Sequence, residues 1–137
     1  MTVFVDTSAF VAYITNEDAN YTVARNTFTR LIEGKERLIT TNYVIVKTCM
    51  ALQRRSGMSV VNAFLQHVVP AVAIEWVDVA LHTSAISAFF ASAKRSPSIV
   101  DCVSFAAMRK LGINTFFAFD PHFTEQGFAG VVAQEYC

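Results

Sequence analysis

The amino-acid sequence predicts an α/β fold of three layers, in which helices cover both faces of a mostly parallel sheet of about four or five strands. Short apolar runs of β-forming residues alternate along the chain with longer segments of helical periodicity. Because such alternation requires crossover connections, we expect the strands to run parallel. The runs are apolar at consecutive positions, which indicates strands buried on both faces. A chain of 137 residues can bury one core, so we expect a single domain over residues 1–137.

Apolar runs mark the expected strands, and the segments between them follow helical spacing. The expected strands are residues 2–5, 38–40, 72–77, 115–119 and an edge strand at 131–133. The expected helices are residues 8–13, 19–33, 42–55, a helix from 59 with an apolar stripe at 60–68, 78–93 and 98–111, with one helical turn at 123–126. Thr41 and Ser98 suit the N-cap positions of two of these helices, and Gly34 suits a C-terminal position.

The composition excludes several classes of protein. Hydrophobic residues make up 53% of the chain and charged residues 16%, which argues against disorder outside the last few residues. Eleven basic and eleven acidic residues cancel, so nucleic-acid binding would require a local basic patch. Three cysteines without CxxC spacing favour a reducing, cytoplasmic location over a disulfide framework or a zinc site.

Neither a signal peptide nor a membrane span is predicted. Asp6 interrupts the first apolar run, and no Lys or Arg precedes it. Residues 56–74 carry no charge, but Pro70 would break a helix there. The apolar stripe at 60–68 and Phe89–Phe90 belong either to the core or to a dimer interface. Because this uncharged stretch is hard to cover within a small domain, we expect the helix around 60–68 and the Phe89–Phe90 helix to help form a homodimer surface.

Three aspartates are the candidate site. Asp6 and Asp120 each directly follow an apolar strand candidate, and Asp101 lies in the first turn of an expected helix. Since the carboxyl ends of parallel strands share one rim, Asp6 and Asp120 should lie on the same rim. We expect the three carboxylates to meet in one acidic pocket that holds Mg²⁺ or Mn²⁺.

Each aspartate also has a purely structural interpretation. Asp6 could be a helix N-cap, and Asp120 could begin an Asp-Pro turn. Asp101 fits a capping box with Ser98. The two interpretations are compatible, because a carboxylate in a first turn can also face a metal.

Neighbouring polar and basic residues complete the expected site. The residues expected to support the carboxylates are Thr7, Ser8, Ser98 and Lys47. The candidates for phosphate contacts with RNA are Arg54, Arg55, Arg109 and Lys110, although basic residues near helix ends are more often plain surface charge. The three histidines show no metal-ligand spacing. His122 follows the rim and could approach the pocket, although packing in the core or a place at the surface is the expected role.

Three segments resemble the PIN-domain family, of the VapC-like toxin ribonuclease type. They are FVDTSAFVAY at 4–13, TTNYVIVKTCMAL at 40–52 and SIVDCVSFAAMRKLGINTFFAFDPHF at 98–123, in the order and spacing of that family. The resemblance implies a PIN-like nuclease domain and an endoribonuclease that depends on Mg²⁺ or Mn²⁺. It matches Asp6, Asp101 and Asp120 to acidic residues of the family and implies RNA as substrate, with a cognate antitoxin protein as partner.

One position departs from the family pattern. Members usually carry a glutamate in a segment resembling NYVLDET, and Lys47 occupies that position here. No acidic residue lies between Arg37 and Ile74. Lys47 could extend its ammonium group into water or form a salt bridge with Asp6 or Asp101. The alternative function is therefore a degenerate PIN domain with weak or no nuclease activity, which binds RNA or protein.

Overall fold

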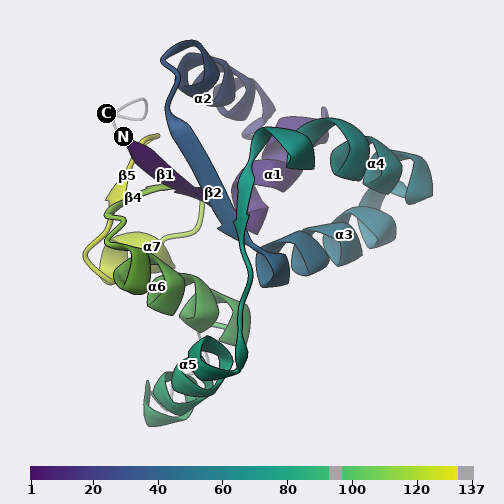
Figure 1. The fold of residues 1–137 in the computed structure, drawn as a ribbon. Helices are drawn as coiled ribbons and strands as arrows, with labels where there is room; N and C mark the ends of the chain where they lie inside the picture. Colours follow the sequence, from purple (N-terminus) through teal and green to yellow (C-terminus); the bar gives the residue numbers. More distant parts are fainter. Residues whose placement is uncertain (93–96, 133–137) are drawn as a thin grey trace.

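The computed structural model describes residues 1–92 and 97–132, and their strands form one parallel five-stranded sheet in the order β3-β2-β1-β4-β5 (Figure 1). The strands are β1 (Thr2–Val5), β2 (Arg37–Thr41), β3 (Ala73–Glu75), β4 (Thr115–Phe117) and β5 (Ala129–Gly130). The helices are α1 (Thr7–Ile14), α2 (Tyr21–Glu33), α3 (Asn42–Ser56), α4 (Met58–Ala63), α5 (Val79–Ser92), α6 (Ile99–Leu111) and α7 (His122–Glu125). The predicted α/β class is confirmed.

The central position of β1 follows from its composition. Val3, Phe4 and Val5 are fully buried, and β1 pairs with β2 on one side and with β4 on the other. In register, Val3 lies opposite Leu38 of β2 and Thr115 of β4. A continuous apolar strand is stable only where both faces are covered, and the centre of this sheet meets that condition.

Alternating phenylalanines attach helices to one face of the sheet. Phe123 of α7 stacks on Phe116 of β4 with ring centroids 5.1 Å apart and lies 6.2 Å from Phe4 of β1. The ring of Phe105 in α6 lies edge-on to the Phe123 ring, with the two centroids 5.0 Å apart. Because successive side chains of a strand point to opposite faces, α6 and α7 cover this face.

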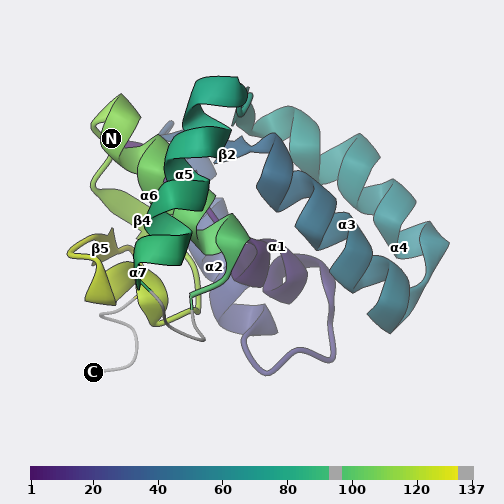
Figure 2. The ribbon, with the colours of Figure 1, turned by 90° about the horizontal axis from the view of Figure 1, so that it is seen from below.

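The opposite face carries the remaining aromatic cluster. Phe117 of β4 lies 6.3 Å from Phe28 of α2, and Phe28 lies 4.6 Å from Tyr13 of α1. Helices α1 and α2 therefore cover this second face. Beyond these layers, α5 packs along α6, and α3 packs against α1 and α4 (Figure 1; Figure 2).

Several predicted boundaries were wrong. The edge strand lies at Ala129–Gly130 instead of residues 131–133, of which residue 133 is outside the described part. A Cβ on Gly130 would come within 3.0 Å of the Phe116 ring. The absence of a side chain at this position therefore lets β5 lie close to β4. β3 ends at Glu75 instead of residue 77, and β4 ends at Phe117 because the next backbone donor, Phe119 N–H, turns to the Ser8 hydroxyl.

The segment after Gly57 is less regular than expected. α4 continues into a π-helical stretch, Phe64–Val68, and a 3₁₀ turn, Val69–Ala71, which contains Pro70. The stripe at 60–68 faces the chain's own core at Val61, Phe64 and Val68, so little of it is available to a partner. Across the described helices, none combines the length and apolar character that crossing a membrane requires.

Two expectations fall on residues outside the described ranges. They are the last residue of the helix at 78–93 and the disorder of the last few residues.

Candidate metal centre

Asp6 ends β1 and begins α1. Its backbone N–H donates to Phe117 O at 3.1 Å, which joins the ends of β1 and β4. The carboxylate oxygen Oδ2 accepts from the backbone N–H of Ser8 at 3.3 Å and from the Ser8 hydroxyl at 3.0 Å. The N-cap interpretation is thus correct, but it uses only one carboxylate oxygen. Oδ1 is buried and has no hydrogen-bond partner among the described residues.

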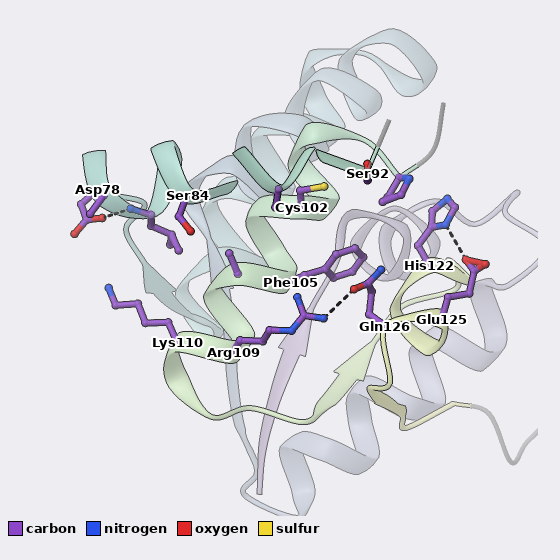
Figure 3. Close-up of a pocket in the computed structure, with 15 residues that line it drawn as sticks. Asp78, Ser84, Ser92, Cys102, Phe105, Arg109, Lys110, His122, Glu125 and Gln126 are labelled. Atoms are coloured by element: carbon purple, nitrogen blue, oxygen red, sulfur yellow. Dashed lines mark hydrogen bonds and ion pairs between the residues drawn. The ribbon is translucent and has the colours of Figure 1, made fainter. Parts of the chain in front are cut away.

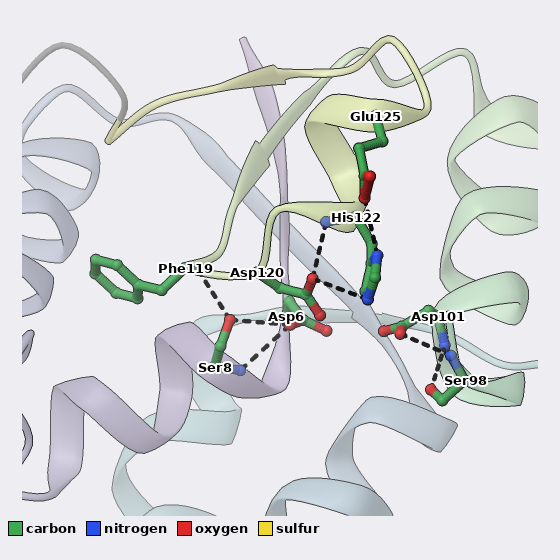
Figure 4. Close-up of polar contacts among 8 residues, drawn as sticks. All are labelled: Asp6, Ser8, Ser98, Asp101, Phe119, Asp120, His122 and Glu125. Carbon is green, nitrogen blue, oxygen red and sulfur yellow. Dashed lines mark hydrogen bonds and ion pairs between the residues drawn. The ribbon is translucent and has the colours of Figure 1, made fainter. Parts of the chain in front are cut away.

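The Ser8 side chain connects the carboxyl ends of two neighbouring strands. Its hydroxyl donates to Asp6 and accepts from Phe119 N–H at 2.9 Å, so one side chain links the residues that follow β1 and β4 (Figure 4). Thr7 has a different role, because its hydroxyl donates to Val44 O at 3.4 Å and accepts from Thr48 at 3.1 Å. Thr7 therefore docks α1 on α3, and its hydroxyl contacts no carboxylate in the described structure.

In Asp101, as in Asp6, one carboxylate oxygen caps a helix and the other has no partner among the described residues. Oδ2 accepts from Ser98 N–H at 3.0 Å, while Asp101 N–H donates to the Ser98 hydroxyl at 3.2 Å. This capping box opens α6. Oδ1 is buried and, among the described residues, lacks a hydrogen-bond partner. The structural interpretation of Asp101 is therefore confirmed, and it leaves one carboxylate oxygen available for a ligand.

Asp120 and His122 complete the cluster. Asp120 Oδ1 accepts from His122 N–H at 2.8 Å, so the expected turn is also present. One ligand atom each from Asp101, Asp120 and His122 lies within 4.8 Å of the others. Figure 4 shows the carboxylates of Asp6, Asp101 and Asp120 gathered beyond the carboxyl ends of the strands.

From the sequence, packing or surface exposure was favoured for His122 over the alternative that it approaches the pocket. Its position two residues after Asp120 was the only available signal, since a turn there brings both side chains to the same rim. In the structure, Nδ1 lies 3.0 Å from Glu125 Oε1, and Nε2 lies 3.9 Å from Asp120 Oδ1. The hydrogen bond with Glu125 raises the pKa of His122, and the charges of Asp120 and Asp101 raise it further.

The electrostatics of the pocket favour a bound cation. Burial, followed by the charge of Asp101, raises the pKa of Asp6 to about 6. Buried carboxylate oxygens without partners are costly, because each has given up hydration without replacement. The Asp6 and Asp101 Oδ1 atoms are of this kind, and hard oxygen donors suit Mg²⁺ or Mn²⁺. The donor set therefore fits a divalent ion.

Lys47 approaches the pocket without pairing. It is half-buried on α3, and its charge lowers the pKa of Asp6. Within the described residues, no carboxylate oxygen lies within 4.0 Å of its ammonium group. The possibility of a direct salt bridge with Asp6 or Asp101 was thus wrong. The ammonium group acts on the pocket over a longer distance.

The basic residues lie away from the carboxylates. Arg55 pairs with Asp18 at 3.1 Å, and Arg54 is exposed nearby at the end of α3. Arg109 and Lys110 occupy the last turn of α6, about 12 Å along the helix axis from Asp101 in its first turn.

A groove connects the two ends of α6. It has a volume of about 850 Å³ and lies among α5, α6 and α7 (Figure 3). His122 and Glu125 line one part of it, and Arg109 and Lys110 line another. His122 is thus the side chain of the acidic cluster that lines this groove with the two basic side chains, whereas Asp6, Asp101 and Asp120 are not among the described residues that line it.

This fold agrees with comparisons to known proteins. Residues 3–129 match the PIN domain, and the chain belongs to the PIN-domain family, among its VapC-like members. It is 35% identical over 131 residues to the 23S rRNA-specific endonuclease VapC20 of Mycobacterium tuberculosis, across 94% of this chain and 97% of that protein.

Solved structures show the same relationship. The crystal structure of Mycobacterium tuberculosis VapC20, described as a sarcin-ricin loop cleaving toxin, aligns with a TM-score of 0.80 at 34% identity. That alignment covers 93% of this chain and 96% of VapC20. DNA-bound VapBC from Salmonella typhimurium aligns with a TM-score of 0.68 at 16% identity, over 95% of this chain and 97% of that one, and shares the fold.

The raised pKa of Asp6 predicts a stability cost that depends on pH. In the folded protein the group titrates near 6, against 3.8 for an ordinary aspartate. Below pH 3.8 both states are protonated and the cost is absent; it grows as pH rises to 6 and is complete above 6. In EDTA, Asp6→Asn should therefore be more stable than the parent at pH 7.5 by up to about 3 kcal/mol, and the gap should close towards pH 4.

Urea denaturation across this pH range measures the difference. The control is Glu17→Gln at an exposed position, which should follow the parent at every pH. Excess Mn²⁺ should reduce or reverse the advantage of Asp6→Asn, because a ligand that binds the native state stabilises it. A constant gap from pH 4 to 7.5 would contradict the assignment of a buried, ionised Asp6.

Proposed function

We propose that the protein is a metal-dependent endoribonuclease of the PIN-domain toxin type, which cleaves RNA phosphodiester bonds at Asp6, Asp101 and Asp120. The observation that carries this proposal is the pair of buried, unpartnered oxygens of Asp6 and Asp101 in one pocket. Similarity to VapC20, named as a 23S rRNA-specific endonuclease, supports RNA as the substrate. Ribosomal RNA is therefore the first substrate to test.

The three carboxylates have different parts in this chemistry. Asp6 and Asp101 are 2% and 3% exposed and would bind Mg²⁺ or Mn²⁺ at the buried end of the pocket. A bound divalent ion supplies a water of lowered pKa and positive charge for the scissile phosphate. Asp120, with 23% of its side chain exposed, lies at the mouth and would orient the attacking water.

The groove supports a path for RNA. Arg109 donates to Gln126 at 2.8 Å, and Lys110 pairs with Glu75 at 3.4 Å. Exposed pairs of this kind contribute little stability, so both side chains can exchange these partners for phosphates. Arg54 and Arg55 do not line this groove, and their contact with RNA rests on their exposure alone.

We also infer an antitoxin partner. VapC20 is described as a toxin, and a ribonuclease of that type requires a protein that neutralises it.

The direct test is cleavage of end-labelled 23S rRNA fragments. The parent should cleave with Mn²⁺ and lose activity in EDTA. Asp101→Asn should reduce the rate on the order of 100-fold or more, because it weakens the site that stabilises transition-state charge. Glu17→Gln, at an exposed position, serves as the control and should cleave like the parent. RNA binding without cleavage at any metal concentration would favour the degenerate binding module.

Lys47 is the feature that favours the alternative function, and its replacement separates the two. Lys47→Glu removes a positive charge near Asp6 and adds an oxygen donor, so Mn²⁺ should bind at least about tenfold more tightly, or about 1.4 kcal/mol. Lys47→Ala should fall between the parent and the glutamate variant. Cleavage should be weak in the parent and stronger in Lys47→Glu.

Calorimetry with Mn²⁺ and the same cleavage assay provide the readouts. Equal affinity and equal cleavage in all three proteins would show that Lys47 behaves as a surface residue without influence on the site. The glutamate that the family usually carries at this position would then be unnecessary.

We further propose a homodimer. Apolar side chains are exposed on α3 at Val46 and Met50 and on α5 at Val79 and Phe90, with exposed fractions of 58%, 57%, 82% and 74%. Exposed apolar groups in such number favour a covered surface. Light scattering should give twice the monomer mass, and a monomer at high micromolar concentration would contradict the proposal.

A further inference from the structure

His122 places a nitrogen donor in a pocket whose other donors are carboxylate oxygens. Its nearest ring atom and the oxygens of Asp101 and Asp120 lie within 4.8 Å of one another. Opposite ligands of a small octahedral ion are separated by about 4.2 Å, so modest side-chain movement would bring these atoms to coordination distance.

Glu125 orients the imidazole for this purpose. The short contact between Nδ1 and Glu125 Oε1, at 3.0 Å, assigns the ring proton to Nδ1. The lone pair of the neutral ring then lies on Nε2, the atom nearer to Asp120 Oδ1 at 3.9 Å. A histidine whose second nitrogen donates to a carboxylate is the usual arrangement of a metal ligand, because the carboxylate fixes the tautomer and the ring direction.

An independent observation indicates a ligand in the same pocket. Asp101 is 3% exposed, and its Oδ1 atom has no hydrogen-bond partner among the described residues although it faces Asp120 and His122 (Figure 4). Asp6 Oδ1 is in the same condition at 2% exposure. A cation that all four side chains reach would satisfy both oxygens.

We propose that His122 Nε2 is a ligand of the pocket's cation and that it makes the site select Mn²⁺ over Mg²⁺. This inference rests on the metal centre of the proposed function and adds a ligand and a preference to it. Carboxylates accept Mg²⁺ and Mn²⁺ alike, whereas imidazole suits transition metals. Mn²⁺ is therefore the ion that both kinds of donor in this pocket accept.

Two measurements test the proposal without RNA. Pulsed EPR of the Mn²⁺-loaded parent at pH 8 should show coupling to one imidazole ¹⁴N. The coupling should persist in His67→Ala, which removes an exposed histidine elsewhere, and should be lost in His122→Asp. Calorimetry with Mn²⁺ and Mg²⁺ should show a Mn²⁺/Mg²⁺ affinity ratio at least about tenfold higher in the parent than in His122→Asp, a difference of about 1.4 kcal/mol.

Glu125→Gln provides a second variant that leaves the ligands in place. It should weaken Mn²⁺ binding more than Mg²⁺ binding, because a neutral amide no longer raises the basicity of the imidazole as the carboxylate does. Absence of ¹⁴N coupling in the Mn²⁺-loaded parent, or an unchanged affinity ratio in His122→Asp, would overturn the proposal.

These outcomes are separable from those of the proposed function. Metal-dependent cleavage without ¹⁴N coupling would overturn the role of His122 and leave the ribonuclease intact. Coupling without cleavage would support His122 as a ligand while contradicting the ribonuclease.

Discussion

Two buried carboxylate oxygens without hydrogen-bond partners, on Asp6 and Asp101, are the constraint around which the pocket is built. Folding removes both atoms from water, and neither receives a donor from the described part of the chain. The cost appears in the raised pKa of Asp6, to which burial and then the charge of Asp101 contribute most. A fold retains such a cost where the unpaired groups serve a ligand. Here Asp101 lies with Asp120 and His122 within 4.8 Å, and the charge of Asp101 acts on the neighbouring Asp6.

The same two aspartates combine a structural role with the chemical role that we propose for them. Each uses Oδ2 in the cap of a helix, α1 for Asp6 and α6 for Asp101, and directs Oδ1 into the pocket. The cap fixes the side-chain rotamer, so the free oxygen is already oriented before any ligand arrives. Ser8 extends this rigidity to the neighbouring strand, because its hydroxyl binds both Asp6 and the backbone that leads to Asp120.

The sequence was informative where the site follows from general rules of chain geometry. Asp6 and Asp120 could be placed on one rim because both follow apolar strands of a parallel sheet, and Asp101 because Ser98 marks the start of a helix. His122 could not be placed in this way, since its role depends on the turn at Asp120 and on Glu125 orienting the ring.

The remaining errors have the same origin in tertiary contacts. The edge strand pairs Gly130 with Phe116 of β4, whose ring lies close to the glycine, and the local sequence pattern does not contain this pairing. Lys47 was correctly singled out as a change of charge, but only the structure shows that its ammonium group acts on Asp6 without a direct pair.

The central claim is that the unpartnered oxygens of Asp6 and Asp101 bind one divalent cation. Crystals soaked in Mn²⁺ and measured for anomalous scattering test it most directly. The account predicts one strong peak within coordination distance of both Oδ1 atoms, with Asp120 and His122 Nε2 in the same shell. A pocket without an anomalous peak at saturating Mn²⁺, or with the peak bound only elsewhere on the chain, would contradict it.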